Sequence, residues 1–154
     1  MHTLLLAVGK LRPSFRAACD DYLRRIRRYG PIEEREVRES GRVREPATRR
    51  REESARLERL IPERAHPVVL DRGGSPWTTE QVAARLEKWR GTPLPVCLVI
   101  GGAFGLDPGF SGDRAGVAQW SLGPLTLPHE LARVVVLEQW YRAWTILRGE
   151  AYHK

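Results

Sequence analysis

The stretch Pro95–Gly102 (PVCLVIGG) joins a run of apolar residues to a pair of glycines, and His66–Gly74 (HPVVLDRGG) repeats that arrangement. A short apolar run that ends in glycines is typical of a buried strand followed by a loop. Thr3–Lys10 (TLLLAVGK) has a similar pattern near the beginning of the sequence. Stretches with helical features separate these runs. Because strands that alternate with helices favour a parallel arrangement, the sequence predicts an α/β fold around a mostly parallel sheet.

The first predicted helix begins near Pro13. Its apolar stripe is expected to consist of Phe15, Ala18, Tyr22 and Ile26. The segment that follows, Pro31–Ser40 (PIEEREVRES), alternates weakly and is polar, which predicts a strand near the edge of the sheet. Further along, Thr78 and Gln81 have the spacing of a capping box, and they predict the start of another helix.

Residues 40–55 are nearly all charged or small and show no persistent apolar period. This composition predicts a mobile basic loop that leads into a short helix containing Leu57, Leu60 and Ile61. Two interpretations of the charges remain open. They form either an ordinary solvated surface or a contact with the backbone of a nucleic acid.

The last predicted helix begins at Pro128, runs for about twenty residues and stops at Gly149. It is apolar around most of its circumference, whereas a helix that faces one sheet needs only a narrower stripe. Burial on more than one side is therefore expected. A second subunit would explain this burial most economically, and burial within one chain is the alternative.

The overall composition bounds the class of protein. At 154 residues, with no repeat or linker, residues 1–154 are expected to form a single domain. Twenty-six Lys and Arg against nineteen Asp and Glu leave a net charge of +7, which attracts polyanions. A GC-rich genome would account for the preference for Arg over Lys, but not for the net excess of positive charge.

The sequence gives no sign of a disulfide framework, a metal site or a membrane segment. Cys19 and Cys97 are too few and too far apart for a disulfide framework or a zinc cluster, and Cys97 is expected to be a buried thiol. The four histidines show no metal-ligand spacing, so no metal is predicted. No signal peptide, lipidation motif or long apolar span is present, and we therefore expect a cytoplasmic protein without a membrane partner.

Three loops that follow apolar strands are candidates for a ligand site: Leu70–Gly74, Ile100–Gly105 and Leu122–Pro128. Open α/β sheets bind ligands beyond the carboxyl ends of their strands, and glycines there allow a close approach of the backbone. The motif GGAFG is neither a dinucleotide fingerprint nor a Walker loop. A site made of backbone groups from three loops suits a flat, uncharged heterocycle such as adenine.

Four stretches together resemble a known family. They are Trp120–Lys154 (WSLGPLTLPHELARVVVLEQWYRAWTILRGEAYHK), Leu98–Gly102 (LVIGG), Leu70–Gly74 (LDRGG) and Leu4–Lys10 (LLLAVGK). The chain is similar over nearly its whole length to the RlmH family, and least similar between about Ser40 and Leu57. These are SPOUT-class methyltransferases with a deep trefoil knot near the C-terminus. The resemblance implies S-adenosylmethionine as cofactor, no metal, a homodimer, and methylation of N3 of a pseudouridine in 23S ribosomal RNA at the subunit interface of the assembled ribosome.

The resemblance also implies particular cofactor-binding residues. The family holds its cofactor mainly through the backbone, at positions that correspond here to Leu70, Gly101, Leu122, Gly123, Pro124, Leu125, Thr126 and Leu127. Two positions depart from the family pattern. Phe104 stands where a polar residue is usual, and Leu122–Pro124 replaces a segment that usually contains serine.

The tail Arg148–Lys154 (RGEAYHK) completes the predicted site, since Gly149 frees the last residues to turn toward a pocket across the dimer interface. His153 would remove the proton from the ring nitrogen, Tyr152 would stack on the base, and Lys154 would hold a phosphate or the anionic ring. His129 is a rival base, although a packing role beside the cofactor loop is favoured.

Two arginines of the last helix, Arg142 and Arg133, are predicted to contact RNA, while Glu138 has the spacing to pair with Arg142 instead.

Two alternative functions are considered. One is a catalytically inactive ribosome-binding protein, and the other is a methyltransferase with another RNA target.

Overall fold

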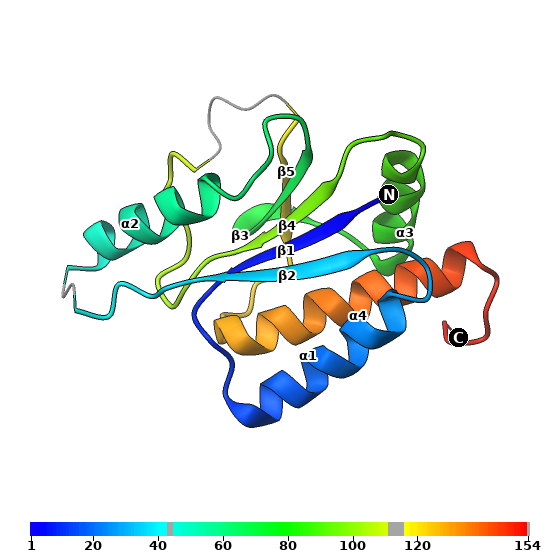
Figure 1. The fold of residues 1–154 in the computed structure, drawn as a ribbon, viewed down its shortest axis with the longest axis horizontal. Coiled ribbons are helices and arrows are strands. Elements are labelled where there is room, and N and C mark those ends of the chain that lie inside the picture. The colour runs from blue at the N-terminus through cyan, green and yellow to red at the C-terminus, as the bar shows by residue number, and fades with distance from the viewer. Residues whose placement is uncertain (43–44, 111–115, 154) are drawn as a thin grey trace.

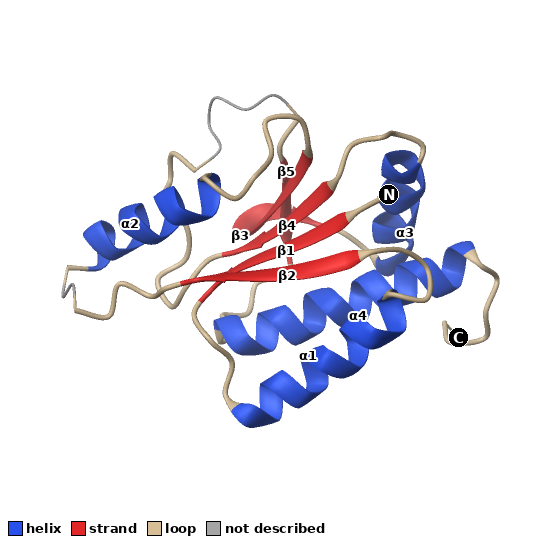
Figure 2. Ribbon diagram, viewed as in Figure 1, coloured by secondary structure: helices blue, strands red, loops and turns tan. Residues whose placement is uncertain are grey.

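A computed structural model describes residues 1–42, 45–110 and 116–153. The strands are β1 Thr3–Val8, β2 Ile32–Val37, β3 His66–Pro76, β4 Val96–Ile100 and β5 Ala118–Ser121. The helices are α1 Pro13–Ile26, α2 Pro46–Glu58, α3 Thr79–Arg90 and α4 His129–Leu147. All the strands run parallel in one sheet of order β2-β1-β4-β3-β5 (Figures 1 and 2). The predicted α/β fold with a parallel sheet is confirmed.

The sheet is covered on both faces, as a parallel sheet requires. Leu5 and Ala7 of β1 point into a core shared with α1, α3 and α4, whereas Leu4, Leu6 and Val8 point into a smaller core under α2. Every residue of β1 and β4 is buried, which explains their continuous apolar sequences. Strand β2 lies at the edge of the sheet, as its polar sequence predicts.

Helix α2 corrects the prediction of a mobile loop at residues 40–55. Pro46 occupies the first turn, and the Glu45 carboxylate accepts hydrogen bonds from the backbone N–H groups of Ala47 (2.8 Å) and Thr48 (2.5 Å). The helix buries Glu53, Ser54 and Leu57. Because its buried face is mostly polar, its sequence lacks the apolar period that would have revealed the helix.

Strand β3 also differs from expectation, because it continues through the glycine pair instead of ending there. Its register with β5 shifts between Leu70 and Ser75. A Cβ atom at Gly74 would lie 2.8 Å from the backbone carbonyl carbon of Gln119. Gly74 therefore permits close contact between two strands.

The predicted helices α1 and α3 are present, with one change of face. Helix α1 buries Cys19, Leu23 and Ile26, rather than the full stripe predicted from Phe15 to Ile26. Burial raises the pKa of the Cys19 thiol to about 11, so the thiol is neutral at physiological pH. Both cysteines are buried and free. In α3, the capping box of Thr78 and Gln81 is formed through both of its hydrogen bonds.

Helix α4 lies between α1 and α3 on one face of the sheet (Figure 1). Its buried positions are Glu130, Arg133, Val136, Leu137, Trp140, Tyr141, Ala143, Trp144 and Thr145. Burial within one chain thus accounts for nine of the nineteen residues of α4, and all but one of the others are partly buried. Gly149, with φ of +67°, follows the helix end as a left-handed C-terminal residue.

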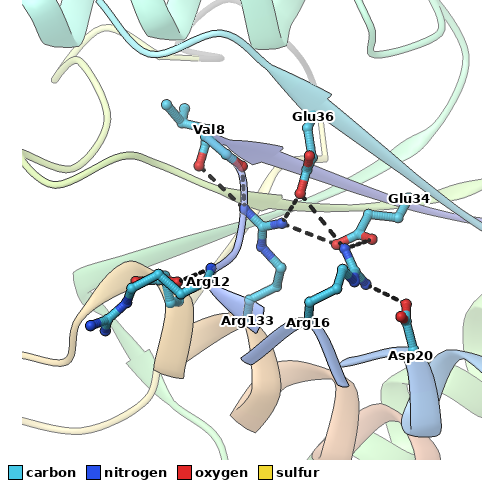
Figure 3. Close-up of polar contacts among 9 residues, drawn as sticks. Val8, Arg12, Arg16, Asp20, Glu34, Glu36 and Arg133 are labelled. Atoms are coloured by element: carbon cyan, nitrogen blue, oxygen red, sulfur yellow. Dashed lines mark hydrogen bonds and ion pairs between the residues drawn. The ribbon is translucent and has the colours of Figure 1, made fainter. Parts of the chain in front are cut away.

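A buried arginine joins α4 to the first two strands (Figure 3). The Arg133 side chain is fully buried, and it donates to the carboxylates of Glu36 (2.6 Å) and Glu34 (3.1 Å). It also donates to the carbonyl oxygens of Gly9 (2.9 Å) and Val8 (3.2 Å). Arg16 contacts Glu34 from α1 at 2.6 Å. One guanidinium therefore fixes α4 against the carboxyl end of β1 and against β2.

Replacing Arg133 with methionine is expected to lower the free energy of unfolding by about 3 kcal/mol, because it removes one partner from a buried charge network. Chemical denaturation followed by circular dichroism measures this change. Arg90 pairs with Glu87 at the surface, so Arg90→Met is the matched control, with an expected loss of at most about 1 kcal/mol. Equal losses in the two variants would contradict the structural role of Arg133.

Candidate active site

A cavity of about 350 Å³ lies at the carboxyl ends of β4 and β5, beside the part of β3 at Leu70 where the apolar run ends. The three loops that the sequence singled out line this cavity. Among the predicted cofactor residues, its lining includes Leu70, Gly101, Leu122, Gly123, Leu125, Thr126 and Leu127. Pro124 is exposed and does not belong to the lining. Segments that are far apart in the sequence therefore form one cavity, and its volume is within the range of small-molecule sites.

Side chains connect the β3 segment to the loop that follows β5. Arg72 Nη1 donates to the Thr126 hydroxyl at 3.0 Å. The Ser121 hydroxyl lies 3.2 Å from the carbonyl oxygen of Arg72 and accepts a hydrogen bond from the Gly123 N–H at 3.2 Å. These contacts fix the shape of the cavity wall. Ser121 also places a hydroxyl directly before Leu122–Pro124, the segment that departs from the family pattern.

The loop after β4 depends on its glycines. A Cβ atom at Gly101 would lie 2.7 Å from the backbone carbon of Gly105 and 2.9 Å from its oxygen. Gly105 has φ of +76°, and its N–H donates to the carbonyl oxygen of Gly102 at 3.0 Å. The loop folds back on itself so tightly that a side chain at Gly101 has no space.

Helix α2 supports this loop from outside the cavity. The Arg49 guanidinium lies 5.0 Å from the centre of the Phe104 ring, and the Asp107 N–H donates to the Ser54 hydroxyl at 2.8 Å. The buried Glu53 carboxylate lies against Gly102, where a Cβ atom would be 2.6 Å from its Oε2 atom. Phe104 thus has a cationic partner on α2. Sequence reasoning missed these contacts because α2 was not predicted to extend over these residues.

The first turn of α4 forms another part of the cavity wall. His129 lines the cavity, a position that fits either of the two roles considered for it. The next residue, Glu130, accepts hydrogen bonds from the backbone N–H (2.7 Å) and the Nε atom (2.8 Å) of Arg12. The Arg12 backbone N–H contributes most to lowering the pKa of the Glu130 carboxyl. A charged Glu130 therefore fixes the start of α4 beside the cavity.

The tail folds back along α4 of its own chain. The Tyr152 hydroxyl donates to Glu138 at 3.1 Å, and its ring packs edge-on against Tyr141, with ring centres 4.8 Å apart. Burial raises the pKa of Tyr152. His153 Nε2 lies 3.4 Å from Glu80 at the start of α3. Lys154 lies outside the described residues.

These tail residues do not line the cavity of the same chain. Glu138, which binds Tyr152, is nine residues beyond His129, a distance of about 14 Å along a helix axis. The cofactor residues and the tail therefore form two separate groups within one chain. If they act together, the cavity and the tail must come from different copies.

The two arginines predicted to contact RNA have different environments. Arg142 pairs with Glu138 at 2.6 Å and lies 4.6 Å from the centre of the Tyr152 ring, so it belongs to the tail group. Arg133 is fully buried in the network shown in Figure 3. The prediction of an RNA contact for Arg133 is corrected, because its guanidinium is enclosed by Glu34, Glu36 and two backbone carbonyls.

The described part of the chain contains neither a metal-ligand cluster nor a membrane-spanning helix. No group of three His, Cys, Asp or Glu side chains there converges in a way that could hold a metal ion. None of the helices described combines the length and apolar character needed to span a membrane.

The parallel sheet, with a cavity formed by three glycine-containing segments, is found together with a sequence match to a class of methyltransferases. A sequence model of the family described as "predicted SPOUT methyltransferase" matches residues 1–153. The match includes every strand of the sheet and every loop that lines the cavity.

Relatives that match nearly the full length give the family within this class. Three are named ribosomal RNA large subunit methyltransferase H. The protein from Rubrobacter xylanophilus is 48% identical over 97% of this chain and 96% of its own length. Those from Solidesulfovibrio magneticus and Geobacter metallireducens are 46% and 41% identical, over 97% and 99% of this chain and 96% and 99% of their own lengths. The chain belongs to the RlmH family of SPOUT methyltransferases.

Proposed function

We propose that this protein transfers a methyl group from S-adenosylmethionine to N3 of a pseudouridine in 23S ribosomal RNA, within the assembled ribosome. The observation that carries the proposal is the single cavity formed by the three predicted loops, in a chain related over its full length to ribosomal RNA methyltransferases. The net charge of +7 is consistent with a polyanionic substrate.

The residues of the cavity fit the proposed cofactor. Leu70, Leu122 and Leu127 offer apolar contacts to the faces of an adenine ring, while the backbone at Gly101 and Gly123 is free of side chains. Polar recognition falls to backbone N–H and C=O groups, which suits a heterocycle with both donors and acceptors. When bound, the cofactor supplies an electrophilic methyl group on a sulfonium, which needs no further activation.

The protein must supply a way to remove the proton from the target nitrogen. N3 becomes nucleophilic when it loses that proton, and His153 is the group proposed to accept it near neutral pH. Tyr152 would orient the base by stacking, and Lys154 would stabilise the negative charge that develops on the ring. Arg142 contacts Tyr152 and would hold its ring in place.

We further propose a homodimer in which the tail of one copy closes over the cavity of the other. Among the described residues, the exposed large apolar side chains are Leu125 (73% exposed), Phe104 (43%) and Leu131 (37%). Leu125 and Phe104 line the cavity, and Leu131 lies in the adjacent first turn of α4. An apolar rim of this kind favours a second copy as its cover.

The trefoil knot of the family is part of the same proposal. Strand β5 lies at the edge of the sheet opposite β2, yet α4, which follows it, returns to pack against α1. Such a return supports the threading typical of SPOUT proteins. Mechanical extension from both termini would distinguish a knotted chain from an unknotted one. An unknotted chain extends to about 3.5 Å per residue, whereas a knotted chain stops at a shorter length.

The function is tested with ribosomes from a strain that lacks the gene. We expect purified protein and S-adenosylmethionine to add one methyl group to intact ribosomes, and mass mapping of 23S fragments to locate it on a pseudouridine. Isolated 23S RNA is expected to be a much poorer substrate, because residues 1–154 are expected to form one small domain without a second domain to hold the free RNA. Equal rates on both substrates, or modification at another type of nucleotide, would refute the corresponding part of the proposal.

A further inference from the structure

A second, larger cavity opens beside α2. Its volume is about 940 Å³, and it lies between the carboxyl ends of β1 and β2 and one side of the helix. Its basic residues are Lys10, Arg38, Arg42 and Arg56, and its acidic residues are Glu36, Glu39 and Glu52. We call it the α2 groove.

Internal pairing neutralises most of the acids in the α2 groove. Glu36 binds the buried Arg133 at 2.6 Å. Glu52 accepts a hydrogen bond from the Ser40 hydroxyl at 2.6 Å and pairs with Arg56 at 3.3 Å. Glu39 is the acidic lining residue that remains outside these pairs.

Lys10, Arg38 and Arg42 are exposed, and none of them forms an ion pair with another residue in the described ranges. Since one acid remains beside these three cations, the α2 groove presents a net positive surface.

The backbone at Arg38 and Ser40 is held in place by hydrogen bonds to α2. Ser40 is buried, and its N–H donates to Glu53 at 2.8 Å. Arg56 donates to the carbonyl oxygen of Arg38 (2.7 Å) and to the Ser40 hydroxyl (2.8 Å). The backbone at Arg38 and Ser40 is therefore already ordered, so a partner that binds Arg38 has little ordering to impose there.

The α2 groove and the cofactor cavity lie at the same edge of the sheet, and α2 contacts both the groove and a loop of the cavity. Because all the strands are parallel, both sites open at the carboxyl ends of the strands. Glu52 and Arg56 face the α2 groove, while Arg49 and Glu53 of the same helix contact the loop of the cofactor cavity. Figure 1 shows α2 beyond the ends of the central strands. An RNA that delivers a base to the cavity would approach this edge.

We propose that the α2 groove binds the phosphate backbone of the ribosomal RNA that carries the target base, through Lys10, Arg38 and Arg42. This inference rests on the proposed function. Unpaired cations around an open groove recognise phosphodiesters without reading base identity, so the α2 groove contributes affinity and orientation rather than sequence choice. For Arg42, the proposal favours the nucleic-acid interpretation of the charges in residues 40–55.

Charge reversal with a matched control tests the proposal. The double variant Arg38→Glu/Arg42→Glu is compared with Arg27→Glu/Arg28→Glu, which changes the net charge equally at exposed positions just beyond α1. Ribosome affinity is measured at several salt concentrations, and S-adenosylmethionine affinity by calorimetry. We expect the groove variant to bind ribosomes at least about tenfold more weakly and to lose about 0.7–0.9 of the logarithmic salt slope per phosphate contact. The control should stay close to wild type, and all proteins should bind the cofactor equally.

The outcomes separate the two proposals. If the wild-type protein transfers no methyl group to ribosomes, the proposed function fails. If the wild-type protein is active while the groove and control variants have the same affinity and salt slope, the α2 groove is not an RNA site. Equal cofactor affinity excludes misfolding as the cause of a selective loss in the groove variant.

Discussion

Replacing His153 with alanine is expected to reduce methyl transfer to ribosomes by about 10²–10⁴-fold, the usual contribution of a general base. Cofactor affinity should not change, because the proposed cofactor contacts all come from the loops that line the cavity and none comes from His153. Single-turnover transfer and calorimetry measure the two quantities. His2 is exposed near the other end of the sequence, and His2→Ala is the matched control. Full activity of His153→Ala would remove the tail from the mechanism.

The same variant shows whether the site is shared between copies. His153→Ala retains a normal cavity, whereas Gly101→Ala retains a normal tail. If the tail acts on a partner's cavity, mixed dimers contain one complete site, and random pairing restores about a quarter of wild-type activity. If the tail acts on its own cavity, every chain in the mixture is defective and no activity returns. Co-expression with two different affinity tags provides the mixed dimer in pure form.

Gly101→Ala is expected to weaken S-adenosylmethionine binding by about 10–100-fold, since overpacking of a tight site typically costs about 1–3 kcal/mol. The added methyl group would lie 2.7 Å from the backbone of Gly105, so the loop must move to accept it. Calorimetric titration of the purified variant measures the effect. Methyl transfer should decrease with cofactor occupancy and recover partly at high cofactor concentration.

A second glycine provides the control for this substitution. Gly91 follows α3, has φ of −73°, and would place a Cβ atom 3.5 Å from the carbonyl oxygen of Lys88, an ordinary contact. Gly91→Ala should therefore bind the cofactor as wild type does. Gly102→Ala should be intermediate, because its Cβ would meet the end of the Glu53 side chain rather than backbone. An unchanged affinity in Gly101→Ala would show that the cofactor does not depend on the tight turn of this loop.

The sheet could be predicted because burial on both faces leaves a local signal. Continuous apolar runs ended by glycine located β1 and β4, and the polar sequence of β2 indicated an edge strand. The cavity could be predicted for a related reason. Parallel strands place the loops after them at one edge, so Leu70, Gly101 and Leu122 had to lie near one another.

What could not be predicted depends on contacts between distant polar residues. Helix α2 has little apolar periodicity because its buried face includes Glu53 and Ser54. Arg133 has the sequence context of a surface cation, and only the meeting of α4 with β2 and the end of β1 encloses it. The partner of Phe104 was unpredictable as well, since Arg49 lies on a helix that had no sequence signature.

The position of β1 between β2 and β4 has a consequence for the biosynthesis of this protein. One of its neighbours, β2, is made soon afterward, but the other, β4, follows only after α2, β3 and α3. During translation, one edge of this very apolar strand therefore stays unpaired until β4 has been made. Unpaired apolar edges favour aggregation of nascent chains. The sheet can close only late in synthesis, and chaperone capture of the emerging N-terminal half is the outcome that this strand order favours.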